Sequence, residues 1–165
     1  MRTIGVISDT HGLLREEAVE ALKGSELILH AGDVGDESIL ERLGEIAPVH
    51  AVHGNTDGGD LRQLLPPTTL VDLAAEDGRV AEAGAPGLLA YVLHDLADLD
   101  VDPVAAEIAM VVTGHTHEPS AEERNGVLYL NPGSAGPRRF RLPVTVAKVV
   151  IRGGKVEAEF LEIVG

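Results

Sequence analysis

Short apolar runs alternate with amphipathic segments over the first third of the chain, and this alternation restricts the fold more than any other feature. Runs rich in Val, Ile and Leu occupy residues 3–8, 27–31 and 49–52, each of a length suited to a buried strand. Residues 14–23 and 36–45 place apolar side chains on one helical face, and Asp36 can cap the second helix. This order predicts parallel βαβ units within an α/β layer.

Strands joined by glycine-bearing turns replace this pattern after residue 68. We expect strands at residues 69–73, 79–83, 88–93, 110–113, 126–130, 144–151 and 156–163, with short helices at 60–65 and 102–108. Two packed sheets flanked by helices accommodate both halves of the chain. The predicted fold class is therefore mixed α/β (α+β), a two-sheet β-sandwich flanked by helices, in a single domain of residues 1–165.

The 165 residues carry a formal net charge of −14 and include no cysteine. Any metal site must therefore use His, Asp, Glu or Asn ligands. An acidic surface repels the nucleic-acid backbone, so we expect no stable nucleic-acid partner. No apolar run is long enough to span a membrane, and the run at the N-terminus is too short for a signal peptide, so we expect a cytoplasmic protein. The sequence leaves a homo-oligomer open.

Polar side chains with metal-ligand chemistry follow five of the predicted strands. They are Asp9, His11, Asp33, Asn55, His94, His115 and His117. The carboxyl ends of parallel strands meet at one edge of a sheet, so these side chains should converge there. Within Asp9-x-His11 and His115-x-His117, an extended backbone would point both side chains to the same side. Imidazole, carboxylate and amide donors suit Mn, Fe, Zn, Co or Ni.

The order and approximate spacing of these motifs resemble the calcineurin-like metallophosphoesterases. The matching motifs are Asp9-x-His11, Gly32-Asp33, Gly54-Asn55-x-Asp57, His94 and Gly114-His115-x-His117. The chain length, and Asn131-Pro132-Gly133-Ser134 followed by Pro137-Arg138, resemble the small single-domain, YfcE-like phosphodiesterase branch. The resemblance covers nearly the whole chain, and it implies a β-sandwich with helices outside, as the strand pattern does.

The resemblance also implies a centre of two divalent ions, manganese first, with iron, zinc, nickel or cobalt as alternatives. One ion would be held by Asp9, His11, Asp33 and His117, and the other by Asp33, Asn55, His94 and His115, with Asp33 bridging. The implied activity is hydrolysis of a small phosphodiester by a hydroxide bound to both ions. Asp33, Asn55 and His115 would be catalytic, whereas Asn55, His53 and Arg138 would contact the substrate phosphate.

Two positions depart from the family pattern. Thr56 stands where many superfamily members carry a histidine that assists the leaving group, which favours esters with good leaving groups. Asp95 stands where the family usually has glycine, so its carboxylate should repel an anionic substrate, or instead cap the segment that follows. A phosphomonoesterase, or a non-catalytic scaffold such as the retromer subunit that shares this fold, are the alternative functions.

Several other polar residues have two interpretations. His53 faces a substrate phosphate or is a strand-end histidine without a role, and Arg138 with Arg139 binds phosphate or forms a charged turn. His30 is expected to make hydrogen bonds in the core or behind the ligands. Asp57 is expected to orient the Gly54-Asn55 loop rather than bind metal.

Overall fold

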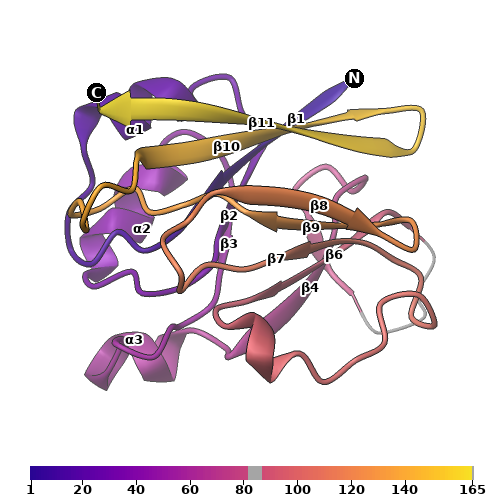
Figure 1. The fold of residues 1–165 in the computed structure, drawn as a ribbon, viewed down its shortest axis with the longest axis horizontal. Helices are drawn as coiled ribbons and strands as arrows, with labels where there is room; N and C mark the ends of the chain where they lie inside the picture. The colour runs from indigo at the N-terminus through magenta and orange to yellow at the C-terminus, as the bar shows by residue number, and fades with distance from the viewer. Residues whose placement is uncertain (82–86, 165) are drawn as a thin grey trace.

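Two mixed β-sheets face each other in the computed structural model, which describes residues 1–81 and 87–164 (Figure 1). The first sheet has the order β11 (Lys155–Val164), β10 (Val144–Arg152), β1 (Arg2–Ile7), β2 (Leu27–His30) and β3 (Val49–Ala51). Strands β1, β2 and β3 are parallel, whereas β10 runs antiparallel to β1 and to β11. The predicted parallel βαβ units are confirmed.

Helices α1 (Glu16–Leu22) and α2 (Glu37–Gly44) make the crossovers between these parallel strands and cover the outer face of the first sheet (Figure 1). The Asp36 side chain accepts a hydrogen bond from the Ser38 N–H at 2.9 Å, so the predicted cap of α2 is confirmed. A third helix, α3 (Gly59–Leu64), follows β3. These connections leave the carboxyl ends of β1, β2 and β3 at one edge of the sheet.

The second sheet has the order β5 (Arg79–Val80), β4 (Thr68–Asp72), β6 (Leu89–Leu93), β7 (Ile108–Val112), β9 (Val127–Asn131) and β8 (Ser120–Arg124). Its centre is parallel, because β6 pairs with β7 and β7 with β9 in the same direction. A 3₁₀ turn, η1 (Leu96–Asp98), follows β6. The second sheet therefore has its own edge of parallel carboxyl ends.

Alternating side chains bury both faces of the central strands. In β1, Ile4 and Val6 join the core between the sheets, whereas Ile7 joins the cluster under α1 and α2. In β6, Ala90 and Val92 point into the same sandwich core, and Leu89 packs on the outer face of the second sheet. A strand buried on both faces presents a near-continuous apolar run, which is why the sequence shows little alternation there.

Two predicted segments differ in the structure. Residues 103–107 form turns rather than a helix, because Glu107 has a φ of +56° and the chain enters β7 at Ile108. Strand β8 was missed because all five of its side chains are exposed. It forms a hairpin with β9 around Asn125 and Gly126, whose φ values of +51° and +81° suit a tight hairpin turn.

The predicted strand 79–83 is shorter than expected, since β5 spans Arg79–Val80 and residues 82 and 83 lie outside the described part of the chain. Among the described residues, no helix has the length and apolar character needed to cross a membrane.

Candidate metal centre

All seven predicted ligands lie in loops that leave the carboxyl ends of parallel strands. The loops after β1, β2 and β3 carry Asp9, His11, Asp33 and Asn55, and the loops after β6 and β7 carry His94, His115 and His117. The centre therefore lies where the parallel edges of the two sheets meet. This is the position at which parallel α/β sheets bind ligands.

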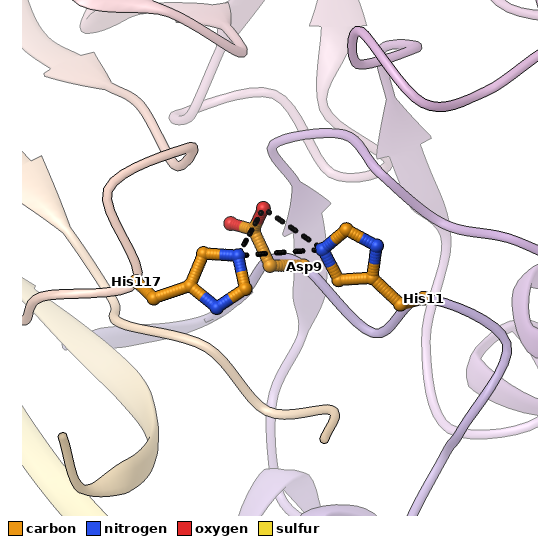
Figure 2. A group of neighbouring side chains, drawn as sticks. All are labelled: Asp9, His11 and His117. Carbon is orange, nitrogen blue, oxygen red and sulfur yellow. Dashed lines mark hydrogen bonds and ion pairs between the residues drawn. The ribbon is translucent and has the colours of Figure 1, made fainter. Parts of the chain in front are cut away.

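The first group of candidate ligands joins Asp9 to His11 and His117 (Figure 2). Figure 2 shows the two imidazoles approaching the carboxylate from opposite sides. Asp9 Oδ1 lies 3.6 Å from His11 Nε2 and 3.4 Å from His117 Nε2, and the two Nε2 atoms are 3.3 Å apart. Three donor atoms thus surround one small volume.

The second group joins Asp9 to Asp33 and His94. Asp33 Oδ2 lies 3.1 Å from His94 Nε2 and 3.6 Å from His11 Nε2, so one carboxylate oxygen faces a histidine of each group. Asp9 Oδ1 is also 3.8 Å from His94 Nε2. The two groups are therefore contiguous, with both carboxylates between them.

Asn55 and His115 form the exposed rim of the centre. His115 Nδ1 lies 3.2 Å from Asn55 Oδ1, and the ring of His115 stands edge-on to that of His94 with 5.2 Å between centroids. The backbone N–H of His115 donates to Asp9 Oδ2 at 3.1 Å. The structure thus brings both residues to the site without placing their side chains inside either group.

Left-handed backbone conformations orient most of these ligands. Asp9, His11, Asp33, His115 and His117 have φ between +46° and +72°. Side chains with a Cβ rarely adopt this region, and clustered outliers of this kind are typical of functional sites. The expectation of an extended backbone through Asp9-x-His11 and His115-x-His117 was wrong. Sharp turns, rather than strand alternation, direct these side chains inward.

Comparison with known proteins identifies the family. The calcineurin-like phosphoesterase superfamily domain matches residues 1–154. The chain belongs to the calcineurin-like phosphoesterase superfamily. It is 34% identical over 166 residues to the "Probable metallophosphoesterase" of Methanothermobacter thermautotrophicus, with 96% of this chain and 91% of that protein covered.

Solved structures of the superfamily share the fold. A phosphoesterase-like protein of Streptococcus pneumoniae is 26% identical with a TM-score of 0.70, covering 98% of this chain and 89% of that one. YfcE, a phosphoesterase of E. coli, is 23% identical with a TM-score of 0.62, covering 98% and 99%. An archaeal phosphodiesterase shares the fold at 21% identity and a TM-score of 0.68, with 96% of this chain and 99% of that one covered. Zinc-complexed Vps29 of Entamoeba histolytica shares it at 20% identity and a TM-score of 0.70, with 98% and 99% covered. The predicted family and fold are confirmed.

Glycine is required at two places in this phosphoesterase centre because backbone and ligand atoms approach closely. A Cβ on Gly54 would collide with the Asp33 carboxylate and backbone nitrogen, and one on Gly114 would collide with Asp9 Oδ2 and Ser8 Oγ. The motif glycines thus let the loops after β3 and β7 come within contact of the carboxylates.

Hydrogen bonds behind the ligands hold the loops in place. The buried Asp57 carboxylate accepts from the N–H groups of Val34, Gly35 and Gly54 at 2.9–3.1 Å, which ties the loop after β2 to the loop after β3. Its expected role in orienting the Gly54-Asn55 loop is supported. His94 Nδ1 donates to the Ala31 carbonyl at 2.8 Å, so its Nε2 lone pair is available to a metal.

His30 is a core residue, as expected. Its Nδ1 accepts from the Gly32 N–H at 3.1 Å, and its Nε2 contacts Thr10 Oγ1 at 3.0 Å. Thr10 donates its own proton to the Val34 carbonyl, so the proton between the two side chains belongs to His30. Complete burial lowers the pKa of His30 to about 4, so it is neutral under physiological conditions.

The electrostatics of the site keep its carboxylates ionised. Burial raises the pKa of Asp9, but the nearby imidazoles of His11 and His117 and the hydrogen bond from Ser8 outweigh that effect and hold the pKa well below its usual range. Burial likewise opposes ionisation of Asp33, yet contacts with His94 and the Thr56 N–H lower its pKa to about 2. Burial lowers the pKa of His94, and its neighbours Asp33 and Asp9 reverse this so that the net pKa is raised.

The donor atoms present fit divalent metal ions. Asp9 Oδ1 and His94 Nε2 are buried and have no hydrogen-bond partner among the described residues, which is costly unless a cation satisfies them. Ligand atoms on an ion with bonds of about 2.1 Å stand roughly 3.0–3.5 Å apart. The observed separations of 3.1–3.8 Å overlap that range and exceed it by at most a few tenths of an ångström.

A cavity of about 230 Å³ opens beside Asn55 and His94. His53 lines it, whereas Arg138 is exposed and is absent from its lining. Asp95 also lines the cavity, and its Oδ1 accepts from the Ala97 N–H at 3.0 Å, so the capping interpretation is borne out.

Asn131 and Ser134 were named as part of a sequence motif, but their role in securing these loops was not predicted. Asn131, at the end of β9, donates to the Gly114 carbonyl at 2.9 Å and to Thr116 Oγ1 at 3.0 Å, holding the loop that carries the two histidines. Ser134 donates to the Asp9 carbonyl at 3.0 Å. The position of Asn131 at a strand end was the available signal, since it repeats the placement of the ligands.

Proposed function

We propose that this chain is a phosphodiesterase that hydrolyses a small phosphodiester with two divalent metal ions, in one catalytic domain of residues 1–165. The observation that carries the proposal is Asp33, whose Oδ2 lies 3.6 Å from a histidine of one ligand group and 3.1 Å from a histidine of the other. Its Oδ1 is occupied by the Thr56 N–H at 2.9 Å, so Oδ2 alone is free to bridge.

The proposed first site uses Asp9, His11, Asp33 and His117, and the second uses Asp33, Asn55, His94 and His115. Two ions held there would lower the pKa of a water molecule and neutralise charge on the phosphoryl oxygens. Manganese is the first choice because the donors are nitrogen and oxygen atoms without thiolate. Iron, zinc, nickel and cobalt remain alternatives for the same donor set.

The protein's own residues prepare this chemistry. The low pKa values of Asp9 and Asp33 keep both carboxylates charged at neutral pH, so no proton must leave before an ion binds. Asn55 and His94 border the cavity, where the phosphate and one alcohol arm would lie, with His53 on the adjacent wall. Asn55 is placed to donate to a phosphoryl oxygen through its amide.

Two observations bear on the substrate, and the second favours diesters over monoesters. Thr56 offers no imidazole to protonate a poor leaving group, so substrates with good leaving groups should react best. The archaeal structure with the same fold is described as a phosphodiesterase. Similarity to Vps29 keeps a scaffold function as the second candidate. The intact set of ligands favours catalysis.

A substrate screen tests the proposal. The purified chain is treated with chelator, reloaded separately with Mn²⁺, Zn²⁺, Ni²⁺ or Co²⁺, and assayed with a bis-aryl phosphodiester and the matching aryl monoester. We expect faster hydrolysis of the diester, abolished by chelation. Preference for the monoester would support a phosphomonoesterase. Binding of two ions without turnover of either ester would support the scaffold alternative.

A further inference from the structure

His115 is the least buried histidine of the metal centre. Its side chain is 43% exposed, compared with 6% for His94 and 4% for His117. Close packing holds the two buried rings, and a hydrogen bond to Ala31 fixes the tautomer of His94. Packing cannot hold an exposed imidazole in the same way, so the orientation of His115 depends on its polar contacts.

The two ring nitrogens of His115 face different partners. Nδ1 lies 3.2 Å from Asn55 Oδ1 and donates to it in this structure; both atoms face the proposed second ion, whose binding would displace the proton from Nδ1. Nε2 lies 3.7 Å from Asp95 Oδ2, within ion-pair distance. A carboxylate beyond one nitrogen favours the proton on that nitrogen and leaves the lone pair on the other.

Asp95 is itself held in place. It directly follows His94, and its Oδ1 accepts the Ala97 N–H at 3.0 Å. The Gly114 N–H donates to the His94 carbonyl at 2.9 Å, which joins the loop of Asp95 to the loop of His115. The carboxylate therefore uses one oxygen as a cap and presents the other to the imidazole.

We propose that Asp95 is a positioning residue for His115, holding the imidazole with Nε2 protonated so that Nδ1 ligates the second ion. This inference rests on the proposed two-ion function. The charge at position 95 would then act on a metal ligand as well as on the turn that it caps. Outer partners of ligating histidines typically contribute about 10–100-fold to metal affinity or activity.

The substitution Asp95→Ser separates this role from capping. Serine caps helical turns about as well as aspartate, but its hydroxyl is too short to reach the imidazole. Asp98→Ser is the matched control, because Asp98 lies in the same turn, lines the same cavity and loses the same charge. The backbone N–H of Asp98 donates to the Asp95 carbonyl, and the substitution leaves that hydrogen bond in place.

Calorimetric titration of the chelator-treated 165-residue chain with Mn²⁺ gives the primary measurement. We expect two binding events in the parent chain and in Asp98→Ser. In Asp95→Ser we expect the second event to weaken about 10–100-fold, with the first event and the melting temperature unchanged. Nitrogen-15 NMR of the His115 ring in the Zn²⁺-loaded protein should show the Nε2–H tautomer in the parent chain and in Asp98→Ser, and a mixture in Asp95→Ser alone.

Each alternative has its own outcome. Unchanged second-ion affinity in Asp95→Ser would overturn the positioning role. A lower melting temperature with both binding events weakened would assign Asp95 a structural role and also overturn it. A lower KM for the diester with unchanged metal binding would show that Asp95 only repels substrate. A single binding event in the parent chain would refute the two-ion function itself.

Discussion

Asp33→Asn is the substitution that most directly tests the shared carboxylate. Asparagine keeps the shape of the side chain and removes its charge. Its NH₂ group must take the place of one carboxylate oxygen, either Oδ1 or Oδ2. Turned toward the Thr56 N–H, which donates to Oδ1 at 2.9 Å, it places two donors together. Turned toward His11 and His94, it removes the acceptor that faces both ligand groups. Neither orientation preserves the site.

The expected magnitude follows from charge and distance. At about 4 Å and an effective dielectric near 20, a unit charge pair contributes about 4 kcal/mol, or about 10³-fold in affinity. Because Asp33 Oδ2 faces both ligand groups, we expect the affinity for each ion to fall by about that factor. In the metal-free protein the ionised Asp33 is stabilised by His94 and the Thr56 N–H, which lower its pKa, so the substitution should also lower stability without metal.

The assay is a thermal melt with and without metal. A saturating ion stabilises the folded state by about 2.7 kcal/mol at 100 times its Kd. The parent chain should therefore gain melting temperature on addition of Mn²⁺, and Asp33→Asn should not. Asp9→Asn provides the comparison, since Asp9 Oδ1 lies nearer to His11 and His117 than to His94. It should weaken the first site more than the second. Loss of only one ion in Asp33→Asn would refute bridging by this residue.

Three further outcomes follow from the structure. Gly54→Ala should destabilise the protein by about 1–3 kcal/mol in urea melts and reduce its metal content, because the new Cβ collides with Asp33. Gly44→Ala, at an open helix end, is the control and should be neutral or stabilising. The free energy of unfolding should fall by up to about 3 kcal/mol as pH drops from 6.5 toward 4, because His30 takes up a proton in the unfolded state and, with a pKa of about 4, stays neutral in the folded state. His30→Asn should flatten that pH dependence. An equally steep profile in the variant would contradict the assignment to His30. Phe140→Gly should stabilise the protein by about 0.5–1 kcal/mol in the same melts, because Phe140 is 94% exposed and has a left-handed φ of +52°. A loss of stability would show that its ring packs against the protein in solution.

The strand–helix alternation was legible in the sequence because each element had to bury its own apolar face. Buried apolar residues such as Val6 and Leu29 mark the strands in the local sequence. Parallel crossovers then bring the carboxyl ends of these strands together. The same logic predicted the centre: Asp9, Asp33 and His94 each follow an apolar run, and they meet as expected. Strand β8 was missed because exposed side chains on both faces leave no apolar period, although Asn125-Gly126 marked its turn.

Only the tertiary structure decided how the ligands are aimed. The left-handed φ of Asp9, His11 and His117 exists because the neighbouring loops impose it, and local propensity favours the extended backbone that we expected. The contacts of Asp57 with Val34 and Gly35, and those of Asn131 with Gly114 and Thr116, join different loops, so no local pattern identifies them. The same holds for the contact of Asp95 with His115, whereas its cap on the following turn was expected from the sequence. Sequence determines which side chains reach the edge of the sheet, whereas packing between the loops determines the direction in which each one points.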